Sequence, residues 1–323
     1  KINTAGNEKS PFIHSDSQTL YFSSGPGYDE EGGHMGLGGL DIFFAKTDDK
    51  GEWQLPKNIG YPINTQADDL GFFVNIDGTY GYFATNDQRK TLGKSVGGWD
   101  VYRFELYKEA RPDDVTFIKG NIEISGEDSN KDFSVTVTDA VTKRVTQAVV
   151  DTNTGNYALI VNTKNKNDLI LNVKKKDYVF TSHLISIKDS VADTKPKKLN
   201  VEIKKIETGK TFPLNNIYYE TNSAEIKKES LIVLEGFVTF LKENPGMKVE
   251  IHGHTDNVGN QNDNQNLSAE RAYNVLGTVV SMGIDKSIIL ASKGFGAIKP
   301  IAPNDNELGR AKNRRTEFLI ISK

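Results

Sequence analysis

Short runs of alternating apolar and polar residues dominate the chain up to about residue 203, and helix-like spacing appears only after it. Runs such as FSVTVTD, YALIV and LILNV change character at nearly every second position and are separated by polar turns. This period of two predicts β-strands with one face packed inward. Further along, apolar residues recur every three or four positions in two longer segments, which predicts two amphipathic helices. The pattern indicates a multidomain chain in which β-rich domains precede an α/β domain.

An internal repeat organises the start of the chain. Three motifs recur at a period near 60 residues: GGLDIF (38–43) as GGWDVY (97–102), LYFSS (20–24) as GYFAT (81–85), and INT (2–4) as INT (63–65). Short aromatic strands and Gly/Asp turns at this period are typical of β-propeller blades, and the segments resemble the PD40 repeat, which is related to WD40. Residues 1–107 are therefore predicted to be two blades of a partial β-propeller. Because a closed ring needs about four to eight blades, we expect further blades upstream in a longer protein.

The glycines and acids of this repeat allow a second interpretation. GHMGLGGLD is glycine-rich enough for a phosphate loop, but the matching GKSVGGWD in the next repeat favours a blade turn. Asp41 and Asp100 hold equivalent places, so we predict that they shape turns or strand starts. Trp53 and Trp99 are expected to pack within the blades. No distinctive pair of acids indicates a glycosidase.

A second β-rich region follows the linker YKEARPDD. Its strand-like runs, from IKGNIEI to YVFTSHLISI, are separated by polar turns such as DTNTGNY, which predicts a small β-sandwich. The order of these segments resembles the carboxypeptidase regulatory-like domain, which usually serves as a spacer. We predict that this domain spans residues 113–203.

From about residue 204 onward, strands alternate with helices. NIYYE (216–220) is predicted as a strand and residues 224–244 as a helix; after the strand KVEIHGH, a second helix ends at Gly283. These strands must pair within one small sheet, which predicts an α/β sandwich over residues 204–323. The residues expected to point inward are Leu231, Leu234, Val238 and Leu241 in the first helix, Val249 and Ile251 in the strand, and Ala272, Val275, Leu276 and Val279 in the second helix.

Composition and charge narrow the functional classes. A formal charge of -3, with lysines and acids interspersed, lacks the basic field that neutralises phosphates, so we expect no nucleic-acid partner. The 323 residues contain no cysteine, which excludes disulfides, thiolate nucleophiles and thiolate metal sites. No apolar run is long enough to cross a bilayer. The chain opens on Lys1 and shows no signal peptide, so any targeting or lipid-anchor segment is expected upstream.

The segment IHGHTDNVGNQNDNQNLSAERA (251–272) carries the candidate binding chemistry. Ser268 is predicted to cap the second helix, with Leu267 packing back as a hydrophobic staple. Arg271 then falls in the first turn, where the helix dipole disfavours a cation, so a bound anion is the expected reason for its presence. Asp256 ends the preceding strand and supplies the opposite charge. The pair predicts a clamp for a ligand that carries an ammonium and a carboxylate on one carbon.

Four motifs in this region, HGHTDNVG, NQNLSAERA, GFGAIKP and GRAKNRRTEF, occur in the same order as in the OmpA-like peptidoglycan-binding domain, which residues 204–323 resemble. The resemblance implies that Asp256 and Arg271 hold the free amino-acid centre of meso-diaminopimelate in the stem peptide of peptidoglycan. It implies six further site residues: Thr255 and Asn264 on loops that shape the pocket, Asn313 and Arg314 at its floor, and Thr221 and Asn222 at its rim, where the family often has Phe-Asp.

Simpler and competing interpretations stay open. Asp256 and Arg271 could form a structural salt bridge with each other. His252 and His254 share a strand face but lack a third ligand at zinc-site spacing, and DNVGNQNDN lacks the terminal Glu of an EF-hand. The serines and threonines show no nucleophile motif, so we predict a non-enzymatic protein without metal or cofactor. The competing function is a glycan or peptide hydrolase in the propeller, tethered to the wall by the OmpA-like domain.

The order of the three domains resembles the PorE-type periplasmic proteins of the type IX secretion system of Bacteroidetes. This resemblance implies a periplasmic, outer-membrane-associated protein that anchors a complex to the cell wall. It also implies that envelope or outer-membrane proteins are the partners of the propeller.

Overall fold

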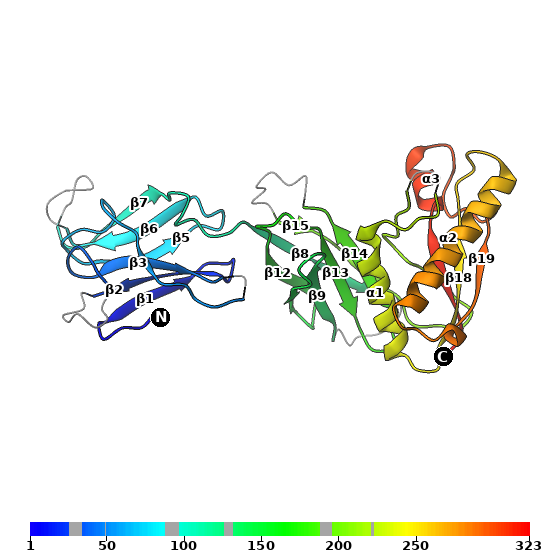
Figure 1. Cartoon of the computed structure of the whole chain (residues 1–323), viewed down its shortest axis with the longest axis horizontal. Helices are drawn as coiled ribbons and strands as arrows, with labels where there is room; N and C mark the ends of the chain where they lie inside the picture. The colour runs from blue at the N-terminus through cyan, green and yellow to red at the C-terminus, as the bar shows by residue number, and fades with distance from the viewer. Residues whose placement is uncertain (26–33, 49, 88–96, 126–131, 188–195, 221–222) are drawn as a thin grey trace. The chain divides into compact units, whose positions relative to one another are not determined.

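The computed structural model describes residues 1–25, 34–48, 50–87, 97–125, 132–187, 196–220 and 223–323. Within them the chain forms two compact units, whose elements are shown in Figure 1. The first unit contains Lys1–Ile118 with two short later segments, and the second contains the rest of the chain, including Lys198–Lys323. None of the described helices is both long and apolar enough to cross a membrane.

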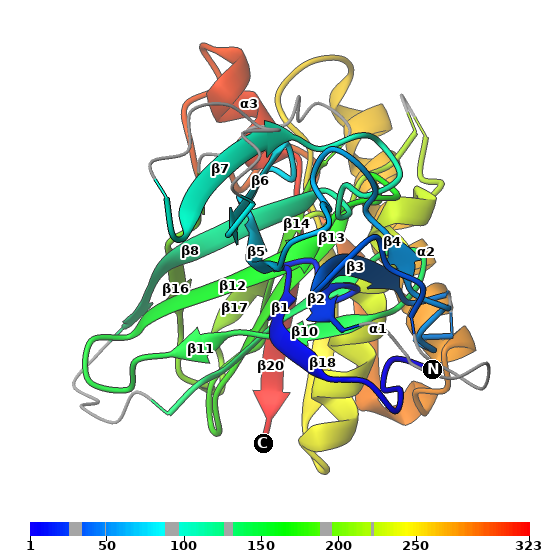
Figure 2. The same cartoon turned by 90° about the vertical axis from the view of Figure 1, so that its left-hand side faces the viewer.

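Two antiparallel sheets form the body of the first unit. One has the strand order β1-β2-β3-β4 and the other the order β5-β6-β7, as can be followed in Figure 2. The strands are β1 (Glu8–Ile13), β2 (Thr19–Ser24), β3 (Asp41–Lys46), β4 (Lys57–Asn58), β5 (Asp69–Val74), β6 (Tyr80–Thr85) and β7 (Asp100–Glu105). The predicted motifs lie on equivalent strands, β2 with β6 and β3 with β7. Among the described residues these strands form two separate sheets and not a closed ring.

Matching local details explain why the two halves of the repeat fold alike. Both β1 and β5 carry a bulge between their second and fifth residues. The threonine of each INT motif binds an acid four positions later: Thr4 Oγ1 donates to Glu8 Oε1 at 2.5 Å, and Thr65 Oγ1 donates to Asp69 Oδ2 at 3.1 Å. The repeated sequence therefore encodes a repeated start of each sheet.

The core of this unit lies between the two sheets. The structure tests the roles predicted for three residues of the repeat, one aspartate and two tryptophans. The buried carboxylate of Asp41 accepts hydrogen bonds from the N–H groups of Leu37 and Gly38 at 2.8 and 3.3 Å, which fits the predicted turn role. Trp53 packs against a small apolar cluster, but Trp99 is 50% exposed, so the packing prediction is wrong for Trp99. The buried core residues are Tyr21, Ile42, Phe44, Ile59, Ile63, Phe72, Val74, Phe83, Leu106 and Ala110.

Two further sheets follow in the middle of the chain. One has the order β10-β9-β13-β14 and the other the order β11-β12-β8-β15, with β16 parallel to β8. The strands are β8 (Val115–Ile124), β9 (Ser134–Asp139), β10 (Val145–Gln147), β11 (Val149–Val150), β12 (Asn156–Asn162), β13 (Leu169–Lys174), β14 (Thr181–Ile185), β15 (Lys197–Lys198) and β16 (Val201–Ile203). In β12 every second residue is buried, as the sequence alternation predicts. The likeness to a carboxypeptidase regulatory-like domain stays a prediction.

The C-terminal part of the second unit is an α/β domain, as predicted. Its sheet has the order β17-β20-β18-β19, in which β18 and β19 are parallel and the other neighbours antiparallel. The elements are β17 (Thr211–Pro213), α1 (Lys228–Glu243), β18 (Lys248–Gly253), α2 (Gln261–Ser281), the 3-10 helix η1 (Lys286–Ile288), β19 (Ile289–Gly294), α3 (Glu307–Asn313) and β20 (Thr316–Ser322).

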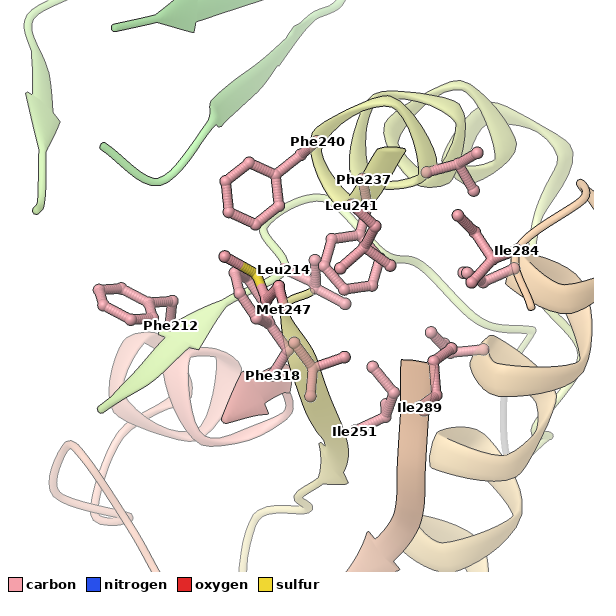
Figure 3. Packing of buried hydrophobic residues seen from close by; sticks show 14 of the residues in the cluster. Phe212, Leu214, Phe237, Phe240, Leu241, Met247, Ile251, Ile284, Ile289 and Phe318 are labelled. Carbon is pink, nitrogen blue, oxygen red and sulfur yellow. The ribbon is translucent and has the colours of Figure 1, made fainter. Parts of the chain in front are cut away.

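Aromatic and aliphatic side chains fill the space between this sheet and the two long helices. The ring of Phe318, on β20, lies 4.8 Å from that of Phe237 and 5.7 Å from that of Phe212, measured between centroids (Figure 3). Of the residues predicted to point inward, Val249, Ile251, Ala272, Val275 and Val279 are fully buried in this core.

Helix α1 is buried on two sides. Leu234 and Phe237 belong to the core of the α/β domain, whereas Ile232 and Val233 pack with Ile170 of β13 in the neighbouring sheet. Figure 1 shows α1 beside β13 and β14. Two ion pairs join the same elements: Lys143 with Glu235 at 2.7 Å and Lys174 with Glu243 at 2.8 Å. The middle sheet and the C-terminal domain therefore share continuous packing through this helix.

Two predicted secondary-structure elements of the C-terminal domain, the strand at 216–220 and the start of the first helix, differ from the structure. Residues 216–220 do not form a strand, because only Tyr219 pairs, in an isolated bridge with Ile226. This bridge holds the chain extended, so α1 begins at Lys228 and not at residue 224. Leu231, predicted to point inward, is only partly buried.

Candidate functional site

The candidate site lies beyond the end of β18, where α2 comes very close to the sheet. Two glycines permit this approach: a Cβ on Gly253 would lie 2.1 Å from the carbonyl oxygen of Ser268, and one on Gly294 would lie 2.4 Å from the amide nitrogen of Ala269. Ser268 is fully buried, and its Oγ accepts a hydrogen bond from Gly296 N–H at 2.8 Å. Ser268 therefore fastens the middle of α2 to the loop after β19.

The observed start of α2 corrects the predicted one. The helix begins at Gln261, and the side chain of Asn260 caps it by accepting hydrogen bonds from two amides of the first turn. Ser268 is thus not a cap, Leu267 is not a staple, and Arg271 lies in the third turn instead of the first. The first two turns are polar and mostly exposed, so no apolar stripe reveals them in the sequence. The amides of the helix N-terminus do not lie beside Arg271.

Arg271 reaches from α2 to the segment that precedes α1. Its Nε donates a hydrogen bond to the carbonyl oxygen of Ser223 at 3.1 Å, and its guanidinium lies 4.5 Å from the ring centroid of Tyr219. The pKa of Arg271 is lowered, mainly because the side chain is partly buried and also because Arg314 repels its charge. Tyr219 and Asp256 oppose this lowering. Arg271 forms no ion pair with any residue in the described part of the chain. A carboxylate could therefore bind its two Nη groups.

Asp256 is buried and already holds two hydrogen bonds. Its Oδ1 accepts from Val258 N–H at 2.9 Å, and its Oδ2 accepts from Arg314 Nη1 at 2.6 Å. Arg314 also donates from Nη2 to Glu307 Oε1, at 2.6 Å, and its bonds to Glu307 and Asp256 raise the pKa of Arg314. Asp256 thus pairs with Arg314, and the alternative of a direct salt bridge between Asp256 and Arg271 is wrong.

Thr255 and Asn264 fix the backbone around Asp256. Thr255 is only 5% exposed, and its N–H donates to Gly296 O at 3.0 Å. Its Oγ1 has no hydrogen-bond partner among the described residues. Asn264 lies in the first turn of α2 and not on a loop, and its Nδ2 donates to Val258 O at 3.0 Å and to Asp256 O at 3.4 Å. Asn264 therefore holds the turn that presents Asp256.

Asn313, at the end of α3, is fully buried. Its Oδ1 accepts hydrogen bonds from two backbone N–H groups, and its Nδ2 donates to Ala302 O at 2.8 Å and to Asn304 Oδ1 at 2.9 Å. These four bonds satisfy both groups of the amide, so Asn313 holds the loop before α3. Thr221 and Asn222, predicted at the rim, lie outside the described residues.

The two histidines near the end of β18 are buried, each beside a different acid. His252 Nε2 lies 3.1 Å from Glu250 Oε2, and burial lowers the pKa of His252. His254 Nε2 lies 3.3 Å from Glu317 Oε2, and its ring stacks on that of Phe295 with centroids 5.3 Å apart. The two imidazoles therefore lie beside different carboxylates. Within the part of the chain that the structure describes, no three His, Asp or Glu side chains gather in a way that could hold a metal ion.

Two residues of the site were not anticipated from the sequence. Glu307 lies seven positions before Arg314 in ELGRAKNR, and this spacing of two helical turns was the available signal for their contact. Tyr219, which lies under Arg271, gave no such signal, because the two residues are far apart in sequence and neither motif specifies the other.

Among the described residues, the site contains Arg271, which has no acid partner, the buried carboxylate of Asp256, which has further lone pairs, and the Thr255 hydroxyl, which has no hydrogen-bond partner. Arg271 offers donors that match a planar carboxylate. Asp256 offers acceptors, and Thr255 Oγ1 can donate or accept. A small ligand that carries both charges would give Arg271 an acid partner and Asp256 a further donor.

This combination, an α/β domain with a charged site beyond its central strand, corresponds to a known class. Residues 218–314 match the OmpA family. The C-terminal part of the chain is therefore an OmpA-family domain. The match does not extend to the β-sheets before it.

Individual relatives match about a third of the chain. The "Probable lipoprotein YiaD" of Escherichia coli (strain K12) is 36% identical over 106 residues, which are 33% of this chain and 48% of YiaD. The "Peptidoglycan-binding protein ArfA" of Mycobacterium tuberculosis (strain ATCC 25618 / H37Rv) is 36% identical over 104 residues, which are 32% of either chain. The crystal structure of the peptidoglycan-associated lipoprotein from Burkholderia pseudomallei is 25% identical, with a TM-score of 0.30 and coverage of 34% of this chain and 99% of that chain. The chain thus spans about half of the length of YiaD and about a third of that of ArfA.

Proposed function

We propose that the C-terminal domain, residues 204–323, binds peptidoglycan without covalent attachment, through the meso-diaminopimelate residue of its stem peptides. The observation that carries the proposal is Arg271, a partly buried cation that has no acid partner among the described residues and lies near the buried Asp256. The free centre of diaminopimelate carries an ammonium and a carboxylate on one carbon. Such a group supplies one charge to each residue. The relative ArfA, a protein named for peptidoglycan binding, supports the same ligand class.

In this proposal each site residue has a distinct task. The Nη groups of Arg271 bind the ligand carboxylate, and Asp256 accepts hydrogen bonds from the ammonium. Thr255 shapes the pocket from the loop after β18, where its N–H donates to Gly296 O. Asn264 supports the turn that carries Asp256, and Asn313 supports the loop before α3.

Arg314, Thr221 and Asn222 complete the proposed site. Arg314 bridges Asp256 and Glu307 at the floor of the site. The resemblance to the OmpA-like domain assigns Thr221 and Asn222 to the rim, although both lie outside the described part of the chain.

The wider role we infer is that of a periplasmic anchor that holds an outer-membrane-associated complex to the cell wall. The two N-terminal sheets are then PD40-type propeller blades that bind envelope proteins, and the middle sheets are a regulatory-like domain. The module order favours a component of the type IX secretion system. Because α1 packs against β13, the middle sheet would act as a rigid extension of the wall-binding domain and not as a loose spacer.

Calorimetry with diaminopimelate-type and lysine-type stem peptides tests the proposal. Lysine keeps the ammonium but lacks the carboxylate, so wild type should bind the lysine peptide more weakly. Because a charge-assisted hydrogen bond contributes about 1.5–3 kcal/mol, Arg271→Ala should lose roughly tenfold or more in affinity for the diaminopimelate peptide. The whole chain is the right material, because removal of residues before 204 would expose Ile232 and Val233 of α1. Equal affinity for the two peptides would refute the clamp.

The coupling of the two charges provides a second test on the same ligand. Asp256→Ala and Arg271→Ala should each weaken binding, but the double variant should lose less than the two losses added together. A ligand held at one end only sits askew, so the second deletion has less interaction to remove. Additive losses would show that the two residues contact independent parts of the ligand. Sedimentation with isolated sacculi would report the same loss on the intact wall.

A further inference from the structure

We propose that Glu307 sets the charge selectivity of this site, by sharing Arg314 with Asp256 so that Asp256 keeps enough negative charge to bind an ammonium. The proposal rests on the proposed function and assigns a specificity role to a residue that does not itself touch the ligand. Glu307 is thus a positioning residue. Its side chain is 64% exposed and lies on the first turn of α3.

The geometry that points to this role is the divided fork of Arg314. A guanidinium commonly places two parallel N–H groups on one carboxylate. Here Nη1 binds Asp256 and Nη2 binds Glu307, both at 2.6 Å, so each acid receives one donor. The side chain of Arg314 is 39% exposed and that of Asp256 only 10%, so Glu307 holds the guanidinium at the edge of the site while Asp256 faces inward.

The charges near the site explain why this division matters. Asp256 and Glu307 are the acids of the cluster, and Arg271, Arg310 and Arg314 are its cations, with Arg310 bound to Glu307 at 3.0 Å. Without Glu307 the cluster gains one net positive charge, and both N–H groups of Arg314 become available to Asp256. An ammonium would then meet a neutralised Asp256 and an added repulsion, whereas a carboxylate at Arg271 would meet neither cost. Glu307 therefore favours a zwitterion over a simple anion.

Three stem peptides separate the two charges of the ligand. The first contains meso-diaminopimelate, the second contains 2-aminopimelate, which keeps the distal carboxylate and lacks the ammonium, and the third contains lysine, which does the reverse. The quantity of interest is the ratio of the dissociation constants for the 2-aminopimelate and diaminopimelate peptides. A variant that merely loosens α3 weakens both peptides alike and leaves this ratio unchanged.

We expect Glu307→Gln to lower the ratio about three- to fivefold, the size of effect that a solvent-screened charge pair has on an equilibrium. Affinity for the lysine peptide should fall by a similar factor, since its ammonium depends on Asp256 in the same way. In an Arg314→Gln background, Glu307→Gln should change the ratio less than it does in wild type, because the division of the fork passes through Arg314.

Two matched controls accompany the variant. Glu229→Gln makes the same change of charge on the first turn of α1, and Arg310→Gln removes the other ion pair of Glu307. Glu229→Gln should leave the ratio at its wild-type value, and Arg310→Gln, which removes a cation of the cluster, should not lower it. If wild type binds the diaminopimelate peptide but Glu307→Gln leaves the ratio unchanged, or changes it equally in the Arg314→Gln background, the selectivity role is refuted and the binding function stands. If wild type binds none of the peptides, both proposals fall.

Discussion

The strand β18 and the loop after it contain two contrasting kinds of burial. Along the strand, Val249 and Ile251 are fully buried among the apolar side chains of the core. Just beyond it, Thr255 and Asp256 are 5% and 7% exposed, yet Thr255 Oγ1 has no partner in the described structure. Apolar burial is favourable by itself, whereas burial of a polar group without a partner costs free energy. The first part therefore stabilises the fold, and the second part is held in place by that fold.

The largest expected effect is a loss of stability from a substitution in the apolar part. Ile251→Ala should lower the free energy of unfolding by about 2–5 kcal/mol, because it deletes buried methyl groups in a close-packed core and leaves a cavity. Urea denaturation of the whole chain, monitored by far-UV circular dichroism, measures the loss of stability. Leu290→Ala, on the neighbouring β19 where the side chain is 53% exposed, is the matched control and should change stability by less than about 0.5 kcal/mol. Similar losses in the two variants would contradict the contrast, as would a loss of ligand affinity by folded Ile251→Ala.

A second effect sharpens the comparison from the polar side, at Glu317. Burial alone would raise the pKa of Glu317, but His254 and Arg315 outweigh burial and lower it from 4.5 to about 2. A carboxyl whose pKa is depressed in the folded state stabilises the fold above its unfolded pKa and loses that contribution as pH falls through the folded pKa. A lowering of this size corresponds to a contribution of about 3 kcal/mol to the free energy of unfolding.

The pH dependence of unfolding measures this contribution. Wild type should lose stability between about pH 4.5 and pH 2, and Glu317→Gln should be less stable at neutral pH but show a flatter profile across that window. Glu229→Gln is the control, and its profile should follow wild type. A Glu317→Gln profile as steep as that of wild type would show that other groups carry the acid sensitivity.

The two parts also differ in how far the sequence predicts them. Alternation in KVEIHGH identifies Val249 and Ile251 as inward residues, because a strand with one buried face has a period of two. The helical spacing identifies Ala272, Val275 and Val279 for the same kind of reason. These features are local, and each depends only on a few neighbouring positions.

The polar part depends on contacts that no local pattern specifies. Asn260 and Ser268 are both good capping residues, and the polar turns between them hide which one starts α2. Arg271 and Arg314 are both near Asp256, and complementary charge alone does not decide which of them pairs with it. The resemblance to the OmpA family agrees with the family match over residues 218–314, but the division of Arg314 between Asp256 and Glu307 is visible only in three dimensions.

The smallest predicted effect sharpens the comparison at the support of Arg271. The ring of Tyr219 lies 4.5 Å from the guanidinium, and its hydroxyl is 2.7 Å from Thr316 Oγ1. A cation–π contact contributes about 0.5–1 kcal/mol at an exposed site, so Tyr219→Leu should weaken binding of the diaminopimelate peptide about two- to fivefold. Tyr219→Phe keeps the ring and loses only the hydrogen bond to Thr316, so it should lower stability slightly and leave affinity unchanged. Calorimetric titration of the two variants at one ionic strength separates these outcomes. If Tyr219→Phe and Tyr219→Leu weaken binding equally, the hydroxyl and not the ring orients Arg271. The ring then contributes only to the packing of the apolar core.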